Sequence, residues 1–264
     1  MFVISAVVPT RNRIGLLADA IASLVGVERI VVVDDASEEA NVVSDLADSH
    51  RNVTLFRNDI AKGAAACRNI GVGLSDGEWI LFLDDDDILL DGYLKEMAGV
   101  IRAHPEVEAW APSYREGRQH TRRRVRDCDV NFVNAVSGCS GFLIKRKLFD
   151  DIGGFDEALV SMQDWDLWMR IVGRSQFWYS GIVGVSYALA SPGKITHNLW
   201  SKYRGLRRLY IKHKLRFGSF ACIWHLHRLY ALRIILNLSR FSSRRTFFSP
   251  LVAFYWLRWR RYAV

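Results

Sequence analysis

The feature that most constrains the fold is an apolar run that ends in four consecutive carboxylates. The run Trp79–Leu83 has no polar side chain, follows the turn-like Asp76-Gly77, and leads directly into Asp84–Asp87. A short, fully apolar run predicts a strand that is buried on both faces, as in a parallel sheet. The acids then lie just past the carboxyl end of that strand, where open α/β sheets bind their ligands.

Four adjacent carboxylates repel one another, so a fold tolerates them most readily beside a cation or in solvent. Asp84 and Asp86 alternate in this run, and paired carboxylates are hard oxygen ligands suited to Mg²⁺ or Mn²⁺. The other interpretation is a solvated acidic loop that begins the next helix, because a helix N-terminus favours Asp. The run alone leaves both interpretations open.

The rest of the N-terminal region alternates strands with helices. Strands are expected at residues 2–8, 29–33, 53–56, 79–83, 107–111 and 137–144, and helices at 14–24, 38–50, 63–74, 89–104, 147–152 and 163–170. This alternation with short connections is typical of a parallel α/β sheet. No glycine-rich dinucleotide fingerprint follows the first strand and no P-loop motif occurs, so those nucleotide-binding folds lose their main support.

Residues 115–126 contain six arginines and His120. We expect a mobile loop here, which either presents a solvated basic surface or grips a phosphate.

The charge of the chain is strongly asymmetric. All 28 acidic residues lie at or before Asp166, whereas residues 198–264 carry 15 Lys/Arg and no acid. Residues 1–197 therefore have a net charge of −7 within a chain of net charge +8. We expect the basic C-terminal segment to bind an anionic partner.

The composition of this segment favours a membrane surface as that partner. Residues 199–210 alternate apolar and cationic side chains, residues 247–257 are apolar apart from Ser249, and a basic cluster follows at 258–261. Basic amphipathic helices with aromatic borders lie in anionic membrane interfaces. Packing on the acidic body is the alternative, and no recognition motif supports nucleic-acid binding.

The location expected from the sequence is cytoplasmic, and peripheral at the inner face of the plasma membrane. The four cysteines show no metal-binding spacing and are expected to be free thiols in a reducing compartment. The first residues lack a basic n-region, so no signal peptide is expected. No apolar stretch reaches the roughly 18–20 residues that a membrane-spanning helix needs.

Six short motifs then occur in an order that resembles the family 2 glycosyltransferases, the inverting nucleotide-sugar enzymes of GT-A fold. They are residues 7–13 (VVPTRNR), 30–37 (IVVVDDAS), 62–69 (KGAAACRN), 82–87 (FLDDDD), 153–157 (GGFDE) and 163–168 (QDWDLW). The resemblance implies a GT-A-like α/β domain over residues 1–197, with a Rossmann-type, mostly parallel sheet flanked by helices. Residues 198–264 would form a basic, amphipathic helical extension.

The resemblance also implies a nucleotide-sugar site with a Mn²⁺ or Mg²⁺ ion. Asp86 would bind the metal directly, and Asp84 would contact the ribose and metal-bound water. The remaining donor contacts implied are Pro9, Thr10, Asn12, Asp35 (to the nucleobase), Arg68 and Asp85, and His197 is a weaker candidate metal ligand. Arg68 could instead form a salt bridge on a helix surface, and His197 could be an exposed loop histidine.

The implied catalytic base is Asp164, which would deprotonate the acceptor hydroxyl. The family's usual Glu-Asp pair is Gln163-Asp164 in this chain, so a carboxylate that could raise the pKa of the base is missing. Asp164 could instead be a helix N-cap. Asp166 is expected to brace its helix, and Trp165 and Trp168 could stack on an acceptor sugar or belong to the core.

The function implied is inverting transfer of a sugar from a nucleotide-sugar, most simply a UDP-sugar, to a hydroxyl acceptor. The enzyme would be a metal-dependent hexosyl- or N-acetylhexosaminyltransferase of cell-surface polysaccharide or lipid-linked glycan synthesis. Two alternatives stay open: a non-catalytic relative that binds nucleotide or glycan, and a nucleotidyltransferase on a related scaffold. The loop at residues 9–13 has no glycine, which disfavours the second.

Overall fold

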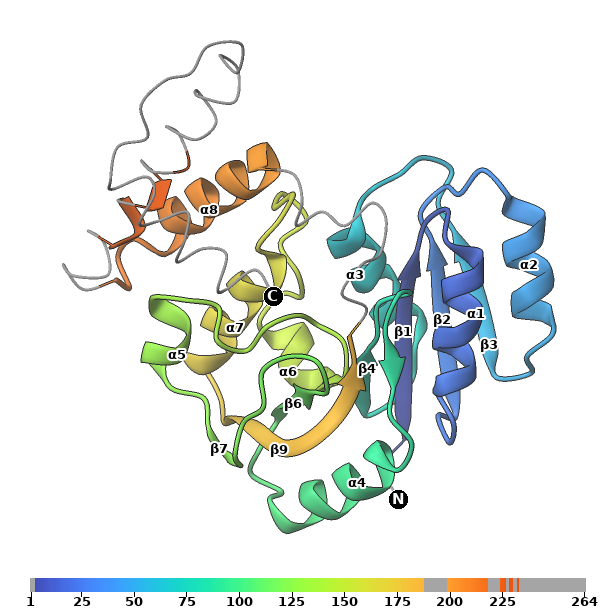
Figure 1. The fold of residues 1–264 in the computed structure, drawn as a ribbon, viewed down its shortest axis with the longest axis horizontal. Coiled ribbons are helices and arrows are strands. Elements are labelled where there is room, and N and C mark those ends of the chain that lie inside the picture. Colours follow the sequence, from blue (N-terminus) through green and yellow to red (C-terminus); the bar gives the residue numbers. More distant parts are fainter. Residues whose placement is uncertain (1–2, 188–198, 218–223, 227, 230–231, 233–264) are drawn as a thin grey trace. The chain divides into compact units, whose positions relative to one another are not determined.

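A computed structural model describes residues 3–187, 199–217, 224–226, 228–229 and 232 (Figure 1). The chain separates into two compact units. The first comprises residues 1–130, 134–158 and 163–188, and the second comprises residues 131–133, 159–162 and 189–264. The predicted metal ligand His197 and the apolar run at 247–257 lie outside the described residues.

Within its described residues, the first unit is built on a nine-stranded sheet in the order β3-β2-β1-β4-β8-β6-β9-β5, with β7 paired to β9. The strands are β1 (Ile4–Thr10), β2 (Arg29–Asp34), β3 (Val53–Arg57), β4 (Trp79–Phe82), β5 (Ile88–Leu89), β6 (Ala109–Tyr114), β7 (Arg123–Arg124), β8 (Phe142–Lys145) and β9 (Phe177–Ser186). The first four strands are mutually parallel, as the sequence predicts. β8 then runs antiparallel to β4, and β6 is antiparallel to β8 but parallel to β9.

The helices of residues 14–172 are α1 (Ile14–Ser23), α2 (Ala40–Asp48), α3 (Ala64–Leu74), α4 (Tyr93–Ala103), α5 (Asp127–Asn131), α6 (Arg146–Asp151) and α7 (Gln163–Val172). Helices α2 and α3 contact the parallel strands, whereas α4 and α6 contact β9 and β8. Neighbouring strand residues point to opposite faces; accordingly, Val32 shares a core cluster with Leu17 of α1, and Val33 packs with Cys67 of α3. A Cβ atom at Gly71 of α3 would lie 2.3 Å from a β1 side chain, so this glycine allows the close packing expected of a small-residue helix.

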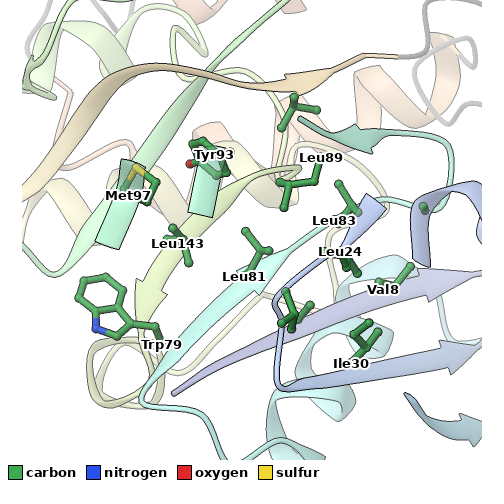
Figure 2. Close-up of a cluster of buried hydrophobic side chains, with 14 of the residues drawn as sticks. Val8, Leu24, Ile30, Trp79, Leu81, Leu83, Leu89, Tyr93, Met97 and Leu143 are labelled. Carbon is green, nitrogen blue, oxygen red and sulfur yellow. The ribbon is translucent and has the colours of Figure 1, made fainter. Parts of the chain in front are cut away.

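A large buried cluster joins the middle of the sheet to α4 (Figure 2). Trp79 and Leu81 of β4 contribute to it, together with Tyr93 and Met97 of α4 and Leu143 of β8. Every residue of β4 is buried, which confirms the strand predicted there. This buried strand, paired on both sides, positions the acidic run that follows it.

The arginine-rich segment 115–126 is not the unstructured loop expected from the sequence. β7 lies within it and pairs with β9, a strand that the sequence analysis did not predict. Arg118 donates a 2.6 Å hydrogen bond to the carbonyl of Asn134, and Arg123 contacts both carboxylate oxygens of Asp129 at 2.7 and 3.1 Å. Several arginines that could have gripped a phosphate therefore hold this segment to the protein itself.

The second unit contains α8 (Leu199–His213), which confirms helical structure at the start of the basic segment. Leu206 and Leu209 are the large apolar side chains that α8 buries. The Ser161 hydroxyl donates a 2.8 Å hydrogen bond to the Ser201 carbonyl near the start of the helix. A Cβ atom at Gly205 would lie 2.6 Å from the Ser161 carbonyl oxygen, so this contact requires a glycine. Among the described residues, no helix combines the length and the apolar character needed to cross a bilayer.

Candidate active site

The candidate site lies at the edge of the sheet where the parallel strands end. The register aligns Thr10 of β1 with Asp34 of β2, and Val7 of β1 with Phe82 of β4. β8 runs the opposite way and its first residue, Phe142, pairs with Phe82. The segment before β8 therefore meets the segments that follow β1, β2 and β4.

Three carboxylates, those of Asp84, Asp86 and Asp87, form an acidic cluster at the end of β4. Oxygen atoms of Asp84, Asp86 and Asp87 all lie within 4.8 Å of one another. The Ser140 hydroxyl joins two of them, because it accepts a 3.0 Å hydrogen bond from the Asp84 backbone N–H and donates to the Asp87 carboxylate. A set of three carboxylate oxygens fits a hard divalent cation. The D-x-D pair was predicted, whereas Asp87 was missed as a third candidate ligand although it stands in the same acidic run.

Asp85 belongs to a different environment from the other three acids. It is buried, and its two oxygens accept hydrogen bonds from Thr10 Oγ1 at 2.8 Å and Arg13 Nη1 at 2.9 Å. Burial raises the pKa of Asp85 to about 6, although the Arg13 charge and the Thr10 hydroxyl oppose that shift. The same guanidinium nitrogen lies 3.4 Å from Asp86. Asp85 and Thr10 thus connect the β1 and β4 loops, and their contact with a donor stays a prediction.

Asn12 connects the loops that follow β1 and β2. Its backbone adopts a left-handed conformation with φ of 54°. Its N–H donates to Ser37 Oγ and its side-chain oxygen accepts from the Glu38 N–H, both at 2.8 Å. Pro9 is buried within β1 opposite Val33. Pro9 and Asn12, which were predicted to contact the nucleotide-sugar, therefore lie at or near the edge where the parallel strands end. Their contact with a nucleotide stays a prediction.

Asp35, at the end of β2, is surrounded by hydrogen-bond donors. Its carboxylate accepts from the backbone N–H groups of Lys62 and Gly63 at 2.7 and 2.9 Å, and from Asn58 Nδ2 at 3.0 Å. Burial alone would raise the pKa of Asp35, but these hydrogen bonds together hold it below its ordinary value. Asp35 is thus a fixed negative charge beside the first turn of α3, where its predicted contact with a nucleobase stays a prediction.

Arg68 of α3 is buried and does not form a salt bridge on the helix surface. Its Nη2 donates to the Asp84 carboxylate, its Nη1 lies 3.5 Å from Gln163 Oε1, and its guanidinium lies 5.4 Å from the centre of the Phe155 ring. Burial would lower the pKa of Arg68, but the negative charge of Asp84 raises it above its ordinary value. Arg68 thus links the acidic cluster to the start of α7.

Asp164, the predicted base, is the second residue of α7. Its Oδ2 accepts a 2.8 Å hydrogen bond from Asn134 Nδ2, which also donates to the Ser137 carbonyl at 3.1 Å. Burial raises the pKa of Asp164, and the charge of Asp84 adds to that shift, whereas the hydrogen bonds from the Trp165 backbone N–H and Asn134 and the Arg68 charge oppose it. Asn134 was missed by the sequence analysis, because nothing in the sequence relates it to a residue 30 positions away.

The remaining predicted side chains of α7 are structural. Asp166 is fully buried and pairs with Arg170 at 2.8 Å, which confirms its bracing role. Trp165 donates from Nε1 to the Val130 carbonyl, and Trp168 is fully buried, so both tryptophans are core residues. Neither indole is exposed for stacking on a sugar.

Comparison with known protein families shows which family this chain belongs to. The sequence model of glycosyl transferase family 2 matches residues 5–159, and a second model, glycosyltransferase like family 2, matches residues 124–235. This chain belongs to glycosyl transferase family 2. The two matches include the acidic cluster, Arg68 and Asp164.

Relatives of the family 2 chain occur in distant bacteria. An uncharacterized glycosyltransferase of Haemophilus influenzae is 29% identical over 66% of this chain and 63% of its own length. The pre-mycofactocin glycosyltransferase of Mycobacterium tuberculosis is 29% identical over 64% of this chain and 39% of its own length. The chain thus matches less than two thirds of either relative.

A solved structure confirms the fold of the family 2 chain. The crystal structure of S. aureus TarS 1–349 in complex with UDP-GlcNAc superimposes with a TM-score of 0.69 at 18% identity, over 87% of this chain and 72% of the other. At this identity the likeness shows a shared fold, and the predicted GT-A-like α/β architecture is therefore confirmed.

Proposed function

We propose that this protein transfers a sugar, with inversion, from a nucleoside diphosphate sugar of the UDP class to a hydroxyl acceptor. The observation that carries the proposal is the position of Arg68. This buried guanidinium pairs with Asp84 of the acidic cluster, and its charge acts on Asp164, where it opposes the rise in pKa that burial causes. The carboxylates of the acidic cluster and the candidate base thus both lie close to the Arg68 charge. Sugar transfer requires such proximity, because the sugar donor and the acceptor have to be held next to each other.

Asp84, Asp86 and Asp87 would hold the Mn²⁺ or Mg²⁺ ion. A divalent cation there would neutralise the negative charge that grows on the leaving diphosphate as the glycosidic bond breaks. Arg13 and Arg68 already contact this cluster, so they add fixed positive charge at the same end of the donor. The three carboxylates would bind the cation and keep it at the carboxyl end of β4.

Asp164 would accept the proton of the acceptor hydroxyl. A general base works best when its pKa is near the operating pH, and burial moves the pKa of Asp164 upward from that of an ordinary Asp. The Asn134 hydrogen bond fixes one carboxylate oxygen, which orients the side chain. Gln163 is neutral and accepts from Arg68, so the missing glutamate is replaced by a side chain that keeps the guanidinium in place.

The donor class is supported by the shared fold, because the S. aureus relative of this fold binds UDP-GlcNAc. For the acceptor we propose a glycan or lipid-linked glycan of the cell surface, on the strength of the basic C-terminal segment. The donor and the acceptor proposed here go beyond the family membership of the chain.

The test is a panel of nucleotide-sugars incubated with the protein and Mn²⁺, with release of nucleoside diphosphate as the readout. We expect one donor to release its diphosphate, and we expect EDTA and Asp86→Ala each to abolish the release. Asp48→Ala removes an exposed carboxylate of α2 and should leave the release unchanged. Because donor hydrolysis without an acceptor can be slow, lipid and glycan fractions are added where release is not seen.

Two results would contradict the proposal. Pyrophosphate as the product would identify a nucleotidyltransferase. Nucleotide binding without release, in the presence of acceptor fractions, would identify a non-catalytic relative.

A further inference from the structure

The solvent-facing side of α8, in the second unit, is strongly basic. Its buried residues include Leu206 and Leu209, whereas Arg204, Arg207 and Arg208 are exposed. At 100° per residue, the three arginines lie on the side of the helix opposite the two leucines. The helix thus buries its apolar face and presents a row of guanidinium groups.

Two apolar side chains are exposed just beyond these arginines along the chain. Ile211 has 48% of its surface exposed, and Leu215, in the turn that follows the helix, has 96% exposed. Ile211 continues the line of the three arginines, because residues three or four apart share a face of a helix. Leu215 follows four residues later, in the turn. A single exposed leucine would need no explanation, but here two apolar residues extend from a cationic surface.

This combination determines what kind of partner fits. The segment that contains α8 has 15 Lys/Arg and no Asp or Glu over residues 198–264, so the partner has to supply the negative charge. Nucleic acid would satisfy the arginines but offers no apolar layer to Leu215. An anionic lipid surface satisfies both groups, since cations bind its headgroups while apolar side chains enter the acyl boundary.

We propose that Arg204, Arg207, Arg208, Ile211 and Leu215 form a docking surface for an anionic membrane. This surface lies on the membrane and does not span it. The cytoplasmic leaflet is the anionic one, so the protein would bind the inner face of the plasma membrane as a peripheral protein. A lipid-linked acceptor would then be available in the same plane as the enzyme.

The test is flotation of the full-length protein with vesicles. Binding to vesicles that contain phosphatidylglycerol, with little binding to pure phosphatidylcholine, is expected. The triple variant Arg204→Gln/Arg207→Gln/Arg208→Gln should lower the partition coefficient on the anionic vesicles by roughly 100-fold. The double variant Ile211→Ser/Leu215→Ser should lower it by about tenfold, and its remaining binding should be more sensitive to salt.

A matched control removes the same charge from the first unit. Arg115, Arg124 and Arg126 are exposed, and their joint replacement by Gln should change the partition coefficient by less than about threefold. All the variants change exposed residues, and circular dichroism checks their folding. The salt dependence of the wild-type protein tests the electrostatic part without any variant.

Several results would overturn the proposal. The first is equal binding to both kinds of vesicle. The second is a fall in the partition coefficient of the control triple variant as large as that of the α8 triple variant. The third is a fall below about threefold in the α8 triple variant. A duplex DNA fragment that displaces the protein from the anionic vesicles would indicate nucleic acid as the partner. None of these measurements depends on catalysis, so they stand apart from the test of the glycosyltransferase activity.

Discussion

The end of β2 and the start of α7 each present one carboxylate to the site, and the protein treats the two in opposite ways. Asp35 accepts hydrogen bonds from two backbone N–H groups and from Asn58, and its pKa lies below the ordinary value. Asp164 is half-buried and accepts hydrogen bonds from the Trp165 backbone N–H and from Asn134, and its pKa lies above the ordinary value. Burial raises the pKa of a carboxyl group, and hydrogen bonds donated to the carboxylate lower it. The balance of these two effects decides the direction of each pKa shift.

This difference separates two roles within one site. A carboxylate with a lowered pKa keeps its charge and can serve as a permanent hydrogen-bond acceptor. A carboxylate with a raised pKa takes up a proton more readily, which is what a general base has to do. Asp35 is thus suited to binding and Asp164 to proton transfer.

The largest effect is expected from removal of the proposed base, Asp164. Asp164→Asn keeps the size of the side chain and can still accept from Asn134, but it cannot take up the proton. We expect kcat to fall by about 10²–10⁴-fold, while the Kd for the nucleotide-sugar changes little. Steady-state kinetics and calorimetric titration measure the two quantities. A loss of kcat below about tenfold would assign the base to another residue.

The matching change at β2 should act on stability. Asp35→Asn leaves one acceptor oxygen and no charge for three donors, so the free energy of unfolding should fall by about 1–3 kcal/mol. Urea unfolding measures this loss. Asp48→Asn, on an exposed residue of α2, should stay within about 0.5 kcal/mol of the wild type. If Asp35→Asn and Asp48→Asn have equal stability, the hydrogen bonds to Asp35 contribute nothing net.

Asn134→Ala tests how the proposed base, Asp164, is held. The variant removes a hydrogen bond to the charged carboxylate, so kcat/KM should fall by about tenfold at neutral pH. Because that hydrogen bond favours the ionised form, its loss should also move the acid limb of the pH–rate profile to higher pH. A pH profile of wild type and variant measures both effects. A lower rate with an unmoved acid limb would mean that Asn134 acts on geometry alone.

The smallest effect is the pH dependence of stability, which should have opposite signs at the two carboxylates. The lowered pKa of Asp35 gives stability that is present above its ordinary pKa of 3.8 and is lost as the pH falls through the folded-state pKa. The raised pKa of Asp164 gives stability that is present at low pH and is lost as the pH rises through its folded-state pKa. Asp164→Asn should therefore be slightly more stable than wild type at neutral pH. Unfolding curves across the acid range test the comparison, which fails if both variants respond to pH in the same direction.

Much of the parallel half could be predicted, because its signals are local. The apolar run before Asp84 indicates a strand buried on both faces, and β4 is such a strand. The acids follow its carboxyl end, and the spacing of residues 163–170 places Asp164 in the first turn of a helix, as observed. Each of these features depends only on neighbours within a few positions along the chain.

The antiparallel half could not be predicted in the same way, because it depends on pairing between distant segments. Two glycines interrupt the pattern of β9, and Gly181 has a left-handed φ of 76° where Arg122 of the neighbouring segment approaches. The arginine segment looked like a solvated loop because its partners, such as the Ser180 carbonyl that Arg122 contacts, are far away in the sequence. The Asn134 contact with Asp164 was invisible for the same reason.

The most direct test of the division between donor binding and proton transfer is Mn²⁺ binding in the presence of UDP, measured beside sugar transfer in two variants. Asp164→Asn should bind Mn²⁺ and UDP as the wild type does and lose transfer. Asp86→Ala should lose both Mn²⁺ binding and transfer, because it removes one of the three clustered carboxylates. Mn²⁺ binding that survives in Asp86→Ala, or that disappears in Asp164→Asn, would contradict the assignment of these two aspartates.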